Sequence, residues 1–170
     1  MSGKFEKEIG LLAIRRLAEE VNYQIILFSL LGDNFWKRID QTIFELLLAD
    51  YPEKERCIVR FLFLGKRILR KESCLSEDEV NSLETMGILN REGDNICLNN
   101  IRLIPYMDLL IFCDFFFKDT ELKTDHVWIG DDSIYLSKVI MTKKNKKVLE
   151  IGTGSGILSL VMAQRDNQVL

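Results

Sequence analysis

The feature that most constrains the fold is a glycine-rich turn between an apolar run and a segment with helical spacing. Val148–Ile151 is a short apolar run, which is typical of a buried parallel strand. The run enters a Gly-x-Gly-x-Gly turn, and the apolar residues of Ile157–Gln164 then recur with helical spacing. Strand, glycine turn and helix in this order predict the first βα unit of a doubly wound α/β fold.

The residue types around this turn indicate what it could bind. Glycines let the backbone turn sharply and let a ligand approach closely, and the following helix N-terminus offers free N–H groups. A nicotinamide dinucleotide fingerprint needs its third glycine at position 157, but that residue is Ile157 and the glycine is Gly156. Glu150, on the strand before the turn, suits a cationic ligand such as an amino group or a sulfonium. A nucleotide cofactor and a purely structural turn remain as alternatives.

The segment from Val148 to Gly156 closely resembles motif I of class I S-adenosylmethionine-dependent methyltransferases. More narrowly, it is similar to the small-domain group that methylates RNA bases or glutamine side chains. The resemblance implies a Rossmann-like domain, S-adenosylmethionine as cofactor, and methyl transfer to a nitrogen of an RNA or protein substrate. It also implies contacts to the methionine and ribose part of the cofactor from Glu150, Gly152, Thr153, Gly154 and Gly156.

A weaker resemblance lies upstream of the glycine turn. Val127–Leu136 resembles the segment before motif I, in which a short strand leads into a helix that caps the cofactor pocket. Asp132 or Ser133 also suits a plain N-cap. The residues leave both interpretations open.

The first two-fifths of the chain is expected to be helical, because its apolar residues recur with helical spacing. Val21–Leu31 is apolar on most faces and is expected at the centre of the core. Pro52 suits the first turn of a helix that ends near Arg70. Leu109–Cys113 and Phe115–Phe117 are expected to be buried strand. The expected buried stripes are Ile9, Leu12, Ala13 and Leu17; Trp36, Ile39, Ile43 and Leu47; and Ile58, Phe61, Leu62 and Leu69.

The clearest local signal is a capping box. Ser76 is expected to cap a helix whose Glu79 reaches back to the Ser76 N–H, and Gly87 suits the left-handed residue that ends this helix. Turn-rich residues 90–95 then join two short apolar runs, which predicts a hairpin. The order is that of a winged helix, and Leu75–Leu98 resembles the winged-helix-like module that precedes some methyltransferase domains. This helix carries acidic and no basic residues, so we expect it to pack or to orient substrate, not to read nucleic acid.

Composition excludes several classes of protein. The chain has 23 Lys and Arg against 26 Asp and Glu, a net charge of −3, which disfavours an overall polyanion-binding surface but leaves a local patch open. Its longest uncharged run, Ile151–Gln164, has 14 residues, fewer than the ~18 of a spanning helix. The N-terminus lacks the apolar segment of a signal peptide. We therefore expect a cytoplasmic protein with no membrane contact.

Cysteine and histidine counts bear on metal sites and redox state. The four cysteines form no CxxC pair, so we expect reduced and mostly buried thiols. His126 is the only histidine, which excludes a His-rich metal site by count. No metal is expected.

Two functional hypotheses follow. In the first, the chain is the N-terminal part of a methyltransferase: residues 1–122 form a helical and winged-helix-like domain that recognises substrate, and residues 123–170 begin an incomplete class I domain. The ribose-binding acid and an Asn-Pro-Pro-Tyr-type motif are not present. The catalytic residues are therefore unknown, and the 170-residue chain alone is expected to be inactive. Three alternatives stay open for the residues from about Met141 onward: they are mobile, they reorder against the N-terminal part, or they pair with another copy of the chain as a homodimer through the cut end. In the second, the chain is a non-catalytic interaction module with a vestigial glycine loop. An acid within a few residues past Leu170 would favour the first hypothesis.

Overall fold

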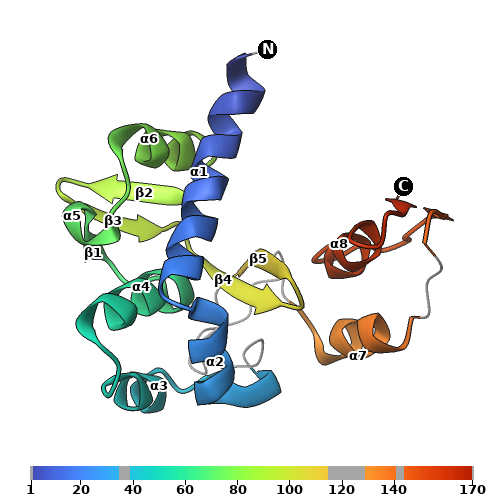
Figure 1. Cartoon of the computed structure of the whole chain (residues 1–170), viewed down its shortest axis with the longest axis horizontal. Helices are drawn as coiled ribbons and strands as arrows, with labels where there is room; N and C mark the ends of the chain where they lie inside the picture. The colour runs from blue at the N-terminus through green and yellow to red at the C-terminus, as the bar shows by residue number, and fades with distance from the viewer. Residues whose placement is uncertain (1, 35–38, 115–128, 141–143, 170) are drawn as a thin grey trace.

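The computed structural model describes residues 2–34, 39–114, 129–140 and 144–169, and its architecture is mixed α/β (Figure 1). The N-terminal part is helical, and its helices pack around one hydrophobic cluster. Its elements are α1 (Ser2–Glu20), α2 (Tyr23–Leu31), η1 (Gly32–Asn34), α3 (Gln41–Leu48) and α4 (Glu53–Leu64).

The buried face of α1 agrees only in part with the expected stripe. Ala13 and Leu17 are buried as expected, but Ile9 is half-buried, Leu12 is 64% exposed, and Ile14, which was not in the expected stripe, is buried. Gly10 explains this register, because its N–H donates to Ser82 Oγ (3.2 Å) and a Cβ there would stand 2.8 Å from that oxygen. The close approach of α1 to α6 at Gly10 therefore selects which of two adjacent apolar rows faces the core.

The α3 stripe is wrong by one position. Phe44 and Leu48 are fully buried, whereas Ile43 and Leu47 are exposed. Asp40 caps α3 by accepting hydrogen bonds from two backbone N–H groups of its first turn. Helix α3 has apolar residues at adjacent positions, so its sequence allows more than one face to be buried. Contacts with neighbouring elements determine which face is buried. Ile39 is half-buried, and Trp36 lies outside the described residues.

Helix α4 supplies the densest part of the core. Ile58, Phe61 and Leu62 are fully buried, as expected. The helix ends at Leu64, not near Arg70, because Gly65 adopts the left-handed conformation that terminates helices. The chain continues as β1 (Ile68–Leu69) and α5 (Arg70–Ser73).

The capping box and the hairpin are confirmed. Helix α6 (Glu77–Thr85) begins after Ser76, whose Oγ accepts from the Glu79 N–H (3.3 Å) while Glu79 Oε2 accepts from the Ser76 N–H (2.7 Å). Strands β2 (Leu89–Glu92) and β3 (Asn95–Leu98) form the hairpin. Strand β1 also pairs with β3, so the sheet order is β1-β3-β2.

A second hairpin lies between the two parts of the molecule. The predicted strand at Leu109–Cys113 is present as β5 (Leu109–Asp114), but its partner β4 (Ile101–Tyr106) has no counterpart in the sequence analysis. Arg102 of β4 is buried, with its guanidinium 5.4 Å from the ring centroid of Phe63. Phe115–Phe117 lie outside the described residues.

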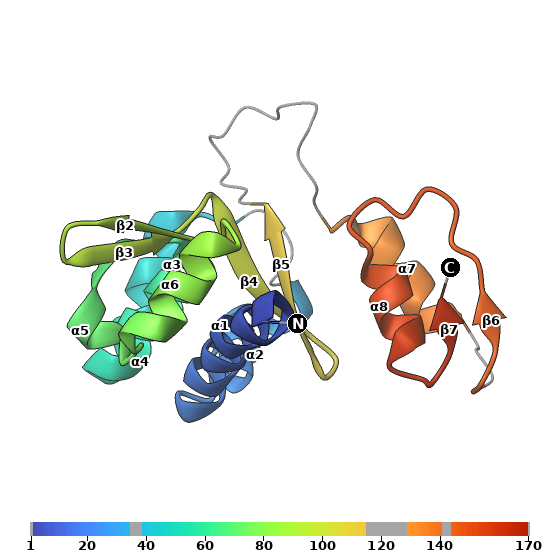
Figure 2. The ribbon, with the colours of Figure 1, turned by 90° about the horizontal axis from the view of Figure 1, so that it is seen from above.

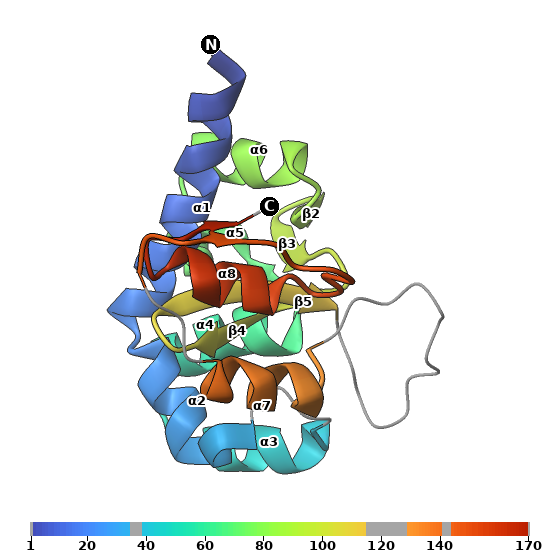
Figure 3. The ribbon, with the colours of Figure 1, turned by 90° about the vertical axis from the view of Figure 1, so that its right-hand side faces the viewer.

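The C-terminal part stands on the other side of β5 from α1 (Figures 1 and 2). It packs onto the rest through α8, which contacts β5 (Figure 3). A hydrogen bond between the buried hydroxyls of Tyr106 and Ser137 also joins β4 to α7. Its elements are α7 (Asp131–Val139), β6 (Lys147–Val148), α8 (Ile157–Ala163) and β7 (Gln168–Val169).

Other expectations concern membranes, metals and thiols. None of the helices that the structure describes combines the length and apolar character of a bilayer-spanning segment. Across residues 2–34, 39–114, 129–140 and 144–169, no group of His, Cys, Asp and Glu side chains is placed to hold a metal ion. The four cysteines are free thiols, but only Cys113 is buried, which corrects the expectation that most are. Burial raises the pKa of the Cys113 thiol.

Candidate functional site

The candidate site is the loop that joins β6 to α8. Strand β7 pairs in parallel with β6, with Val148 opposite Val169, and α8 makes the crossover between them. The predicted order of strand, glycine turn and helix is therefore present, and the strand β7 follows it. All five predicted site residues lie on this one loop, at positions 150–156.

The expected strand is shorter than predicted. Strand β6 ends at Val148, and beyond it Leu149 is 69% and Ile151 89% exposed. Two-residue strands with one partner each do not form the covered sheet in which such residues would be buried. Val148 is in the strand but is only half-buried, so the expectation that Val148–Ile151 is a buried strand is wrong.

The three glycines shape the loop. Gly152, Gly154 and Gly156 have φ angles of 74°, 53° and 72°, which non-glycine residues seldom adopt. A Cβ built on Gly152 would meet no atom within 4 Å, and one on Gly154 only the Gly152 carbonyl oxygen at 3.9 Å. The backbone is thus exposed on the side where a ligand would approach. The Gly156 N–H donates to the Thr153 carbonyl (2.9 Å), which closes the last turn of the loop.

The carboxylate of Glu150 is held at the base of this loop. Glu150 is half-buried, and its Oε2 accepts a hydrogen bond from the hydroxyl of Ser159 in the first turn of α8. Thr153 is exposed, and α8 begins after Gly156 with no side-chain cap. The loop therefore combines one anchored carboxylate with accessible backbone, an arrangement suited to a ligand that carries both a cation and hydrogen-bond acceptors.

The upstream segment is only partly as expected. Helix α7 begins after Gly130, whose backbone is extended and which offers no side-chain cap, so neither Asp132 nor Ser133 is the N-cap. The apolar side chain of Ile134 packs in the core. Helix α7 packs against α8 and thereby supports the loop from behind. Val127 and Trp128 lie outside the described residues.

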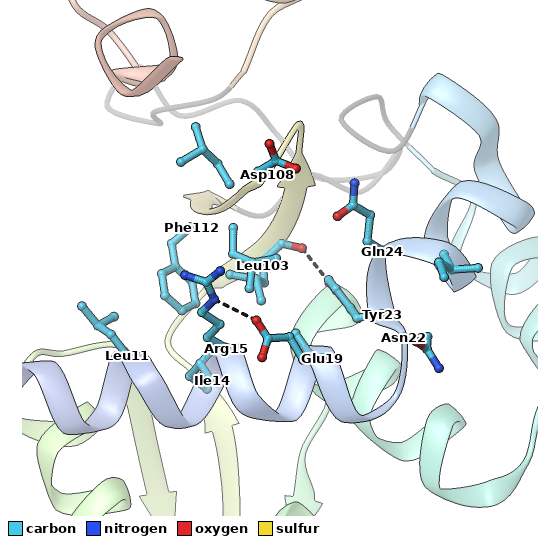
Figure 4. A pocket seen from close by; sticks show the side chains of 14 residues that line it. Leu11, Ile14, Arg15, Glu19, Asn22, Tyr23, Gln24, Leu103, Asp108 and Phe112 are labelled. Atoms are coloured by element: carbon cyan, nitrogen blue, oxygen red, sulfur yellow. Dashed lines mark hydrogen bonds and ion pairs between the residues drawn. The ribbon is translucent and has the colours of Figure 1, made fainter. Parts of the chain in front are cut away.

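A groove between α1, α2 and the β4–β5 hairpin was not anticipated from the sequence. It has a volume of about 710 Å³, and its lining is mainly apolar (Figure 4). Tyr23, the first residue of α2, is buried and donates to the Leu103 carbonyl (2.6 Å). A tyrosine at the start of this mostly apolar run was the available signal that α2 meets a hydrogen-bond acceptor.

Comparison with known proteins gives no family assignment: no family model matches the chain, and no curated protein matches it.

Proposed function

We propose that this chain carries the S-adenosylmethionine-binding loop of a methyltransferase that acts on a nitrogen of RNA or protein. The observation that carries the proposal is the loop between two parallel strands, with Glu150 at its base and three left-handed glycines along it. Bound S-adenosylmethionine would supply a methyl group activated on a sulfonium. The residues of this chain would bind and orient it.

The described residues fit such a ligand in two respects. Glu150 is an anion next to exposed backbone, as a ligand with an amino group and a sulfonium requires. The space above Gly152 and Gly154 is open, so the ligand can approach without meeting a Cβ. Ser159 would hold the carboxylate in place, and Gly156 would open the first turn of α8 toward the ligand.

The N-terminal elements support a separate recognition module ahead of this loop. Helices α4, α5 and α6 with the sheet order β1-β3-β2 follow the connectivity of a winged helix, and the parallel β6–β7 pair follows that of a Rossmann-like unit. In the proposed enzyme, residues 1–122 would recognise the substrate and the segment from 123 onward would bind the cofactor.

Binding can be tested by nuclear magnetic resonance on the ¹⁵N-labelled 170-residue chain titrated with S-adenosylmethionine. We expect weak binding, with a Kd on the order of 1 mM, or about −4 kcal/mol, because the loop forms only one wall of a pocket. The amides of Gly152, Thr153, Gly154 and Gly156 should shift together. Glu150→Gln should weaken binding roughly fivefold, since a partly exposed ion pair contributes about 1 kcal/mol.

A matched pair of glycine substitutions controls for backbone strain. Gly154→Val should abolish the shifts, whereas Gly93→Val, at a left-handed glycine with open space in the β2–β3 turn, should leave them intact. S-adenosylhomocysteine, which lacks the sulfonium charge, should bind more weakly than S-adenosylmethionine. Equal shifts in wild type and Gly154→Val, or none in the loop, would contradict the proposal.

A second candidate is a non-catalytic interaction module. It is favoured by the two-residue strands and by the exposed Leu149 and Ile151, which leave the loop without the enclosure of a cofactor pocket. This candidate predicts no loop shifts with S-adenosylmethionine, together with partner binding by the N-terminal part. The same titration therefore separates the two.

A further inference from the structure

The groove between α1, α2 and the β4–β5 hairpin has an apolar floor. Leu103 and Phe112 are paired across the hairpin and lie on one face, with Leu110 two residues from Phe112 on the same strand. Leu103 is buried, while Leu110 and Phe112 are only half-buried. Ile14 lines the opposite wall, and Leu11, 44% exposed, lines the groove farther along α1 (Figure 4). Such half-covered side chains gain further burial if apolar groups of a partner enter.

Hydrogen bonds hold the groove open at the α2 end. Tyr23 donates to the Leu103 carbonyl (2.6 Å), and Gln24 Nε2 donates to the Met107 carbonyl in the hairpin turn (3.1 Å). These two bonds fix the start of α2 against β4 and the turn. The groove is therefore formed before any ligand binds, which lowers the entropic cost of binding.

The charged side chains that line the groove favour a cationic ligand group. Arg15 Nε lies 2.8 Å from Glu19 Oε1, and both side chains are exposed. Asp108 lines the groove at the hairpin turn and is exposed (Figure 4). The charged residues of the lining are therefore two carboxylates and one guanidinium, and the guanidinium is paired with one of the carboxylates. A Lys or Arg side chain on a partner would be attracted there, and a phosphate would not.

The charge of the whole N-terminal part also disfavours nucleic acid. Residues 1–114 contain 15 Lys and Arg and 19 Asp and Glu, a net charge of −4. In the described part of that region, seven arginines form ion pairs with carboxylates. These arginines are Arg15, Arg16, Arg56, Arg60, Arg67, Arg70 and Arg91. A polyanion that contacts one of these arginines would therefore have to displace a carboxylate.

We propose that this groove binds a protein segment whose apolar side chains cover Leu110 and Phe112 and whose Lys or Arg lies against Asp108, the lining carboxylate with no paired arginine among the lining residues. The volume of about 710 Å³ is within the range of ligand-binding clefts and admits several side chains. None of the glycine-loop residues lines the groove. The proposal therefore stands whether or not the loop binds S-adenosylmethionine, and its test does not use the cofactor.

The test uses three fluorescently labelled probes and anisotropy on the 170-residue chain. The first is a blocked hexapeptide of Leu, Phe and Ala with one Lys, the second has Glu in place of that Lys, and the third is a 12-nucleotide oligouridine. We expect the Lys peptide to bind with a Kd on the order of 100 µM, the Glu peptide roughly tenfold more weakly, and the RNA not measurably.

Two adjacent leucines provide a matched control. Leu11 lines the groove and Leu12 does not, although both are exposed on α1. Leu11→Gln should weaken the Lys peptide roughly tenfold, and Leu12→Gln less than twofold, because only Leu11 contributes apolar surface to the groove. Asp108→Asn should weaken the Lys peptide roughly fivefold and leave the Glu peptide unchanged or slightly tighter.

Chemical-shift mapping with the Lys peptide on the wild-type chain keeps the test decisive if a variant fails to fold. The shifted amides should cluster at Leu11, Leu110 and Phe112. Equal loss of affinity in Leu11→Gln and Leu12→Gln, binding of neither peptide at 1 mM, or tighter binding of the RNA than of the Lys peptide would each overturn the proposal.

Discussion

The N-terminal part of the molecule, residues 8–114, and the C-terminal part, residues 129–169, use the same kinds of apolar residues to different effect. In the first, Phe44, Phe61 and Phe63 are enclosed by several helices and a hairpin and are 0–1% exposed. In the second, Val161 is fully buried, but Ile151, only ten residues away, is 89% exposed. An apolar residue is buried only where enough elements surround it.

The capping of helix N-termini also differs between the two parts of the molecule. In the N-terminal part, α3 and α6 are capped by Asp40 and Ser76, although α2 and α4 have no side-chain cap. In the C-terminal part, both α7 and α8 begin after glycines with no side-chain cap. A side-chain cap stabilises the start of a helix, because it accepts a hydrogen bond from a first-turn N–H group. A glycine start leaves the first-turn N–H groups available, at the expense of local stability. The comparison suggests a stable scaffold joined to a less stable loop whose backbone is open for binding.

The largest expected difference between the two parts is in the free energy of unfolding that is lost when an apolar side chain is truncated. Phe61→Ala should reduce the free energy of unfolding by about 3–5 kcal/mol, because it removes a fully buried ring and leaves a cavity. Ile151→Ala should change it by less than about 0.5 kcal/mol. Urea unfolding followed by circular dichroism measures both. Similar losses for the two variants would mean that Ile151 is enclosed in solution.

Backbone opening should differ between the two parts as well. In native-state hydrogen exchange, the amides of Val80 and Leu83 in the capped helix α6 should exchange roughly 100-fold more slowly than that of Val148, a difference of about 2.7 kcal/mol in opening free energy. Strand β6 has two residues and one partner, so little has to break to open it. Equal protection of the Val148 and Val80 amides from exchange would show that the two parts do not differ in local stability.

The buried hydroxyl of Tyr23 makes the N-terminal part sensitive to alkaline pH. Burial raises the pKa of Tyr23 well above its usual value near 10, and Arg102 lowers it in part. Above pH ~10 the unfolded chain releases this proton while the folded chain retains it, so stability falls with pH by up to about 1.4 kcal/mol per unit.

Unfolding measured between pH 8 and 11 should show this slope in wild type and a smaller one in Tyr23→Phe. Tyr135, exposed on α7, is the matched control, and Tyr135→Phe should keep the wild-type slope. An unchanged slope in Tyr23→Phe would assign the alkaline sensitivity to other groups.

The smallest expected effect concerns helix caps. Ser76→Ala should cost about 1 kcal/mol, because the Glu79 N–H loses its acceptor. Ser133→Ala should cost less than about 0.3 kcal/mol, because α7 begins after Gly130 and Ser133 does not cap it. Thermal unfolding of both variants checks the difference, and a larger loss for Ser133→Ala would show that α7 is capped differently in solution.

Elements that are specified by residues close together in the chain were predictable from the sequence. The capping box at Ser76, the hairpin around residues 90–95 and the glycine turn before α8 each depend on residues within a few positions of one another. Their hydrogen bonds and left-handed backbone conformations follow from residue type, so a linear pattern suffices.

Features that depend on contacts between distant parts of the chain were missed or predicted wrongly. Strand β4 was not anticipated, because its role depends on pairing with β5 and on Arg102 packing over Phe63 of a distant helix. The buried row of α3 was assigned one position away, and that of α1 was right at Ala13 and Leu17 but wrong at Leu12. Both helices carry adjacent apolar rows, and periodicity alone cannot rank them.

By itself, the sequence determined the helical N-terminal part, the capped helix and hairpin, and the position and spacing of the glycine loop with Glu150. These features are short-range, set by caps, turns and glycine φ angles. Only the tertiary structure decided which leucine of the pair Leu11 and Leu12 lines a groove, that Ile151 lies exposed, and that Tyr23 bonds to Leu103. Each of those outcomes depends on which surfaces meet, and a side chain's burial is a property of its neighbours in space, not of its neighbours in sequence.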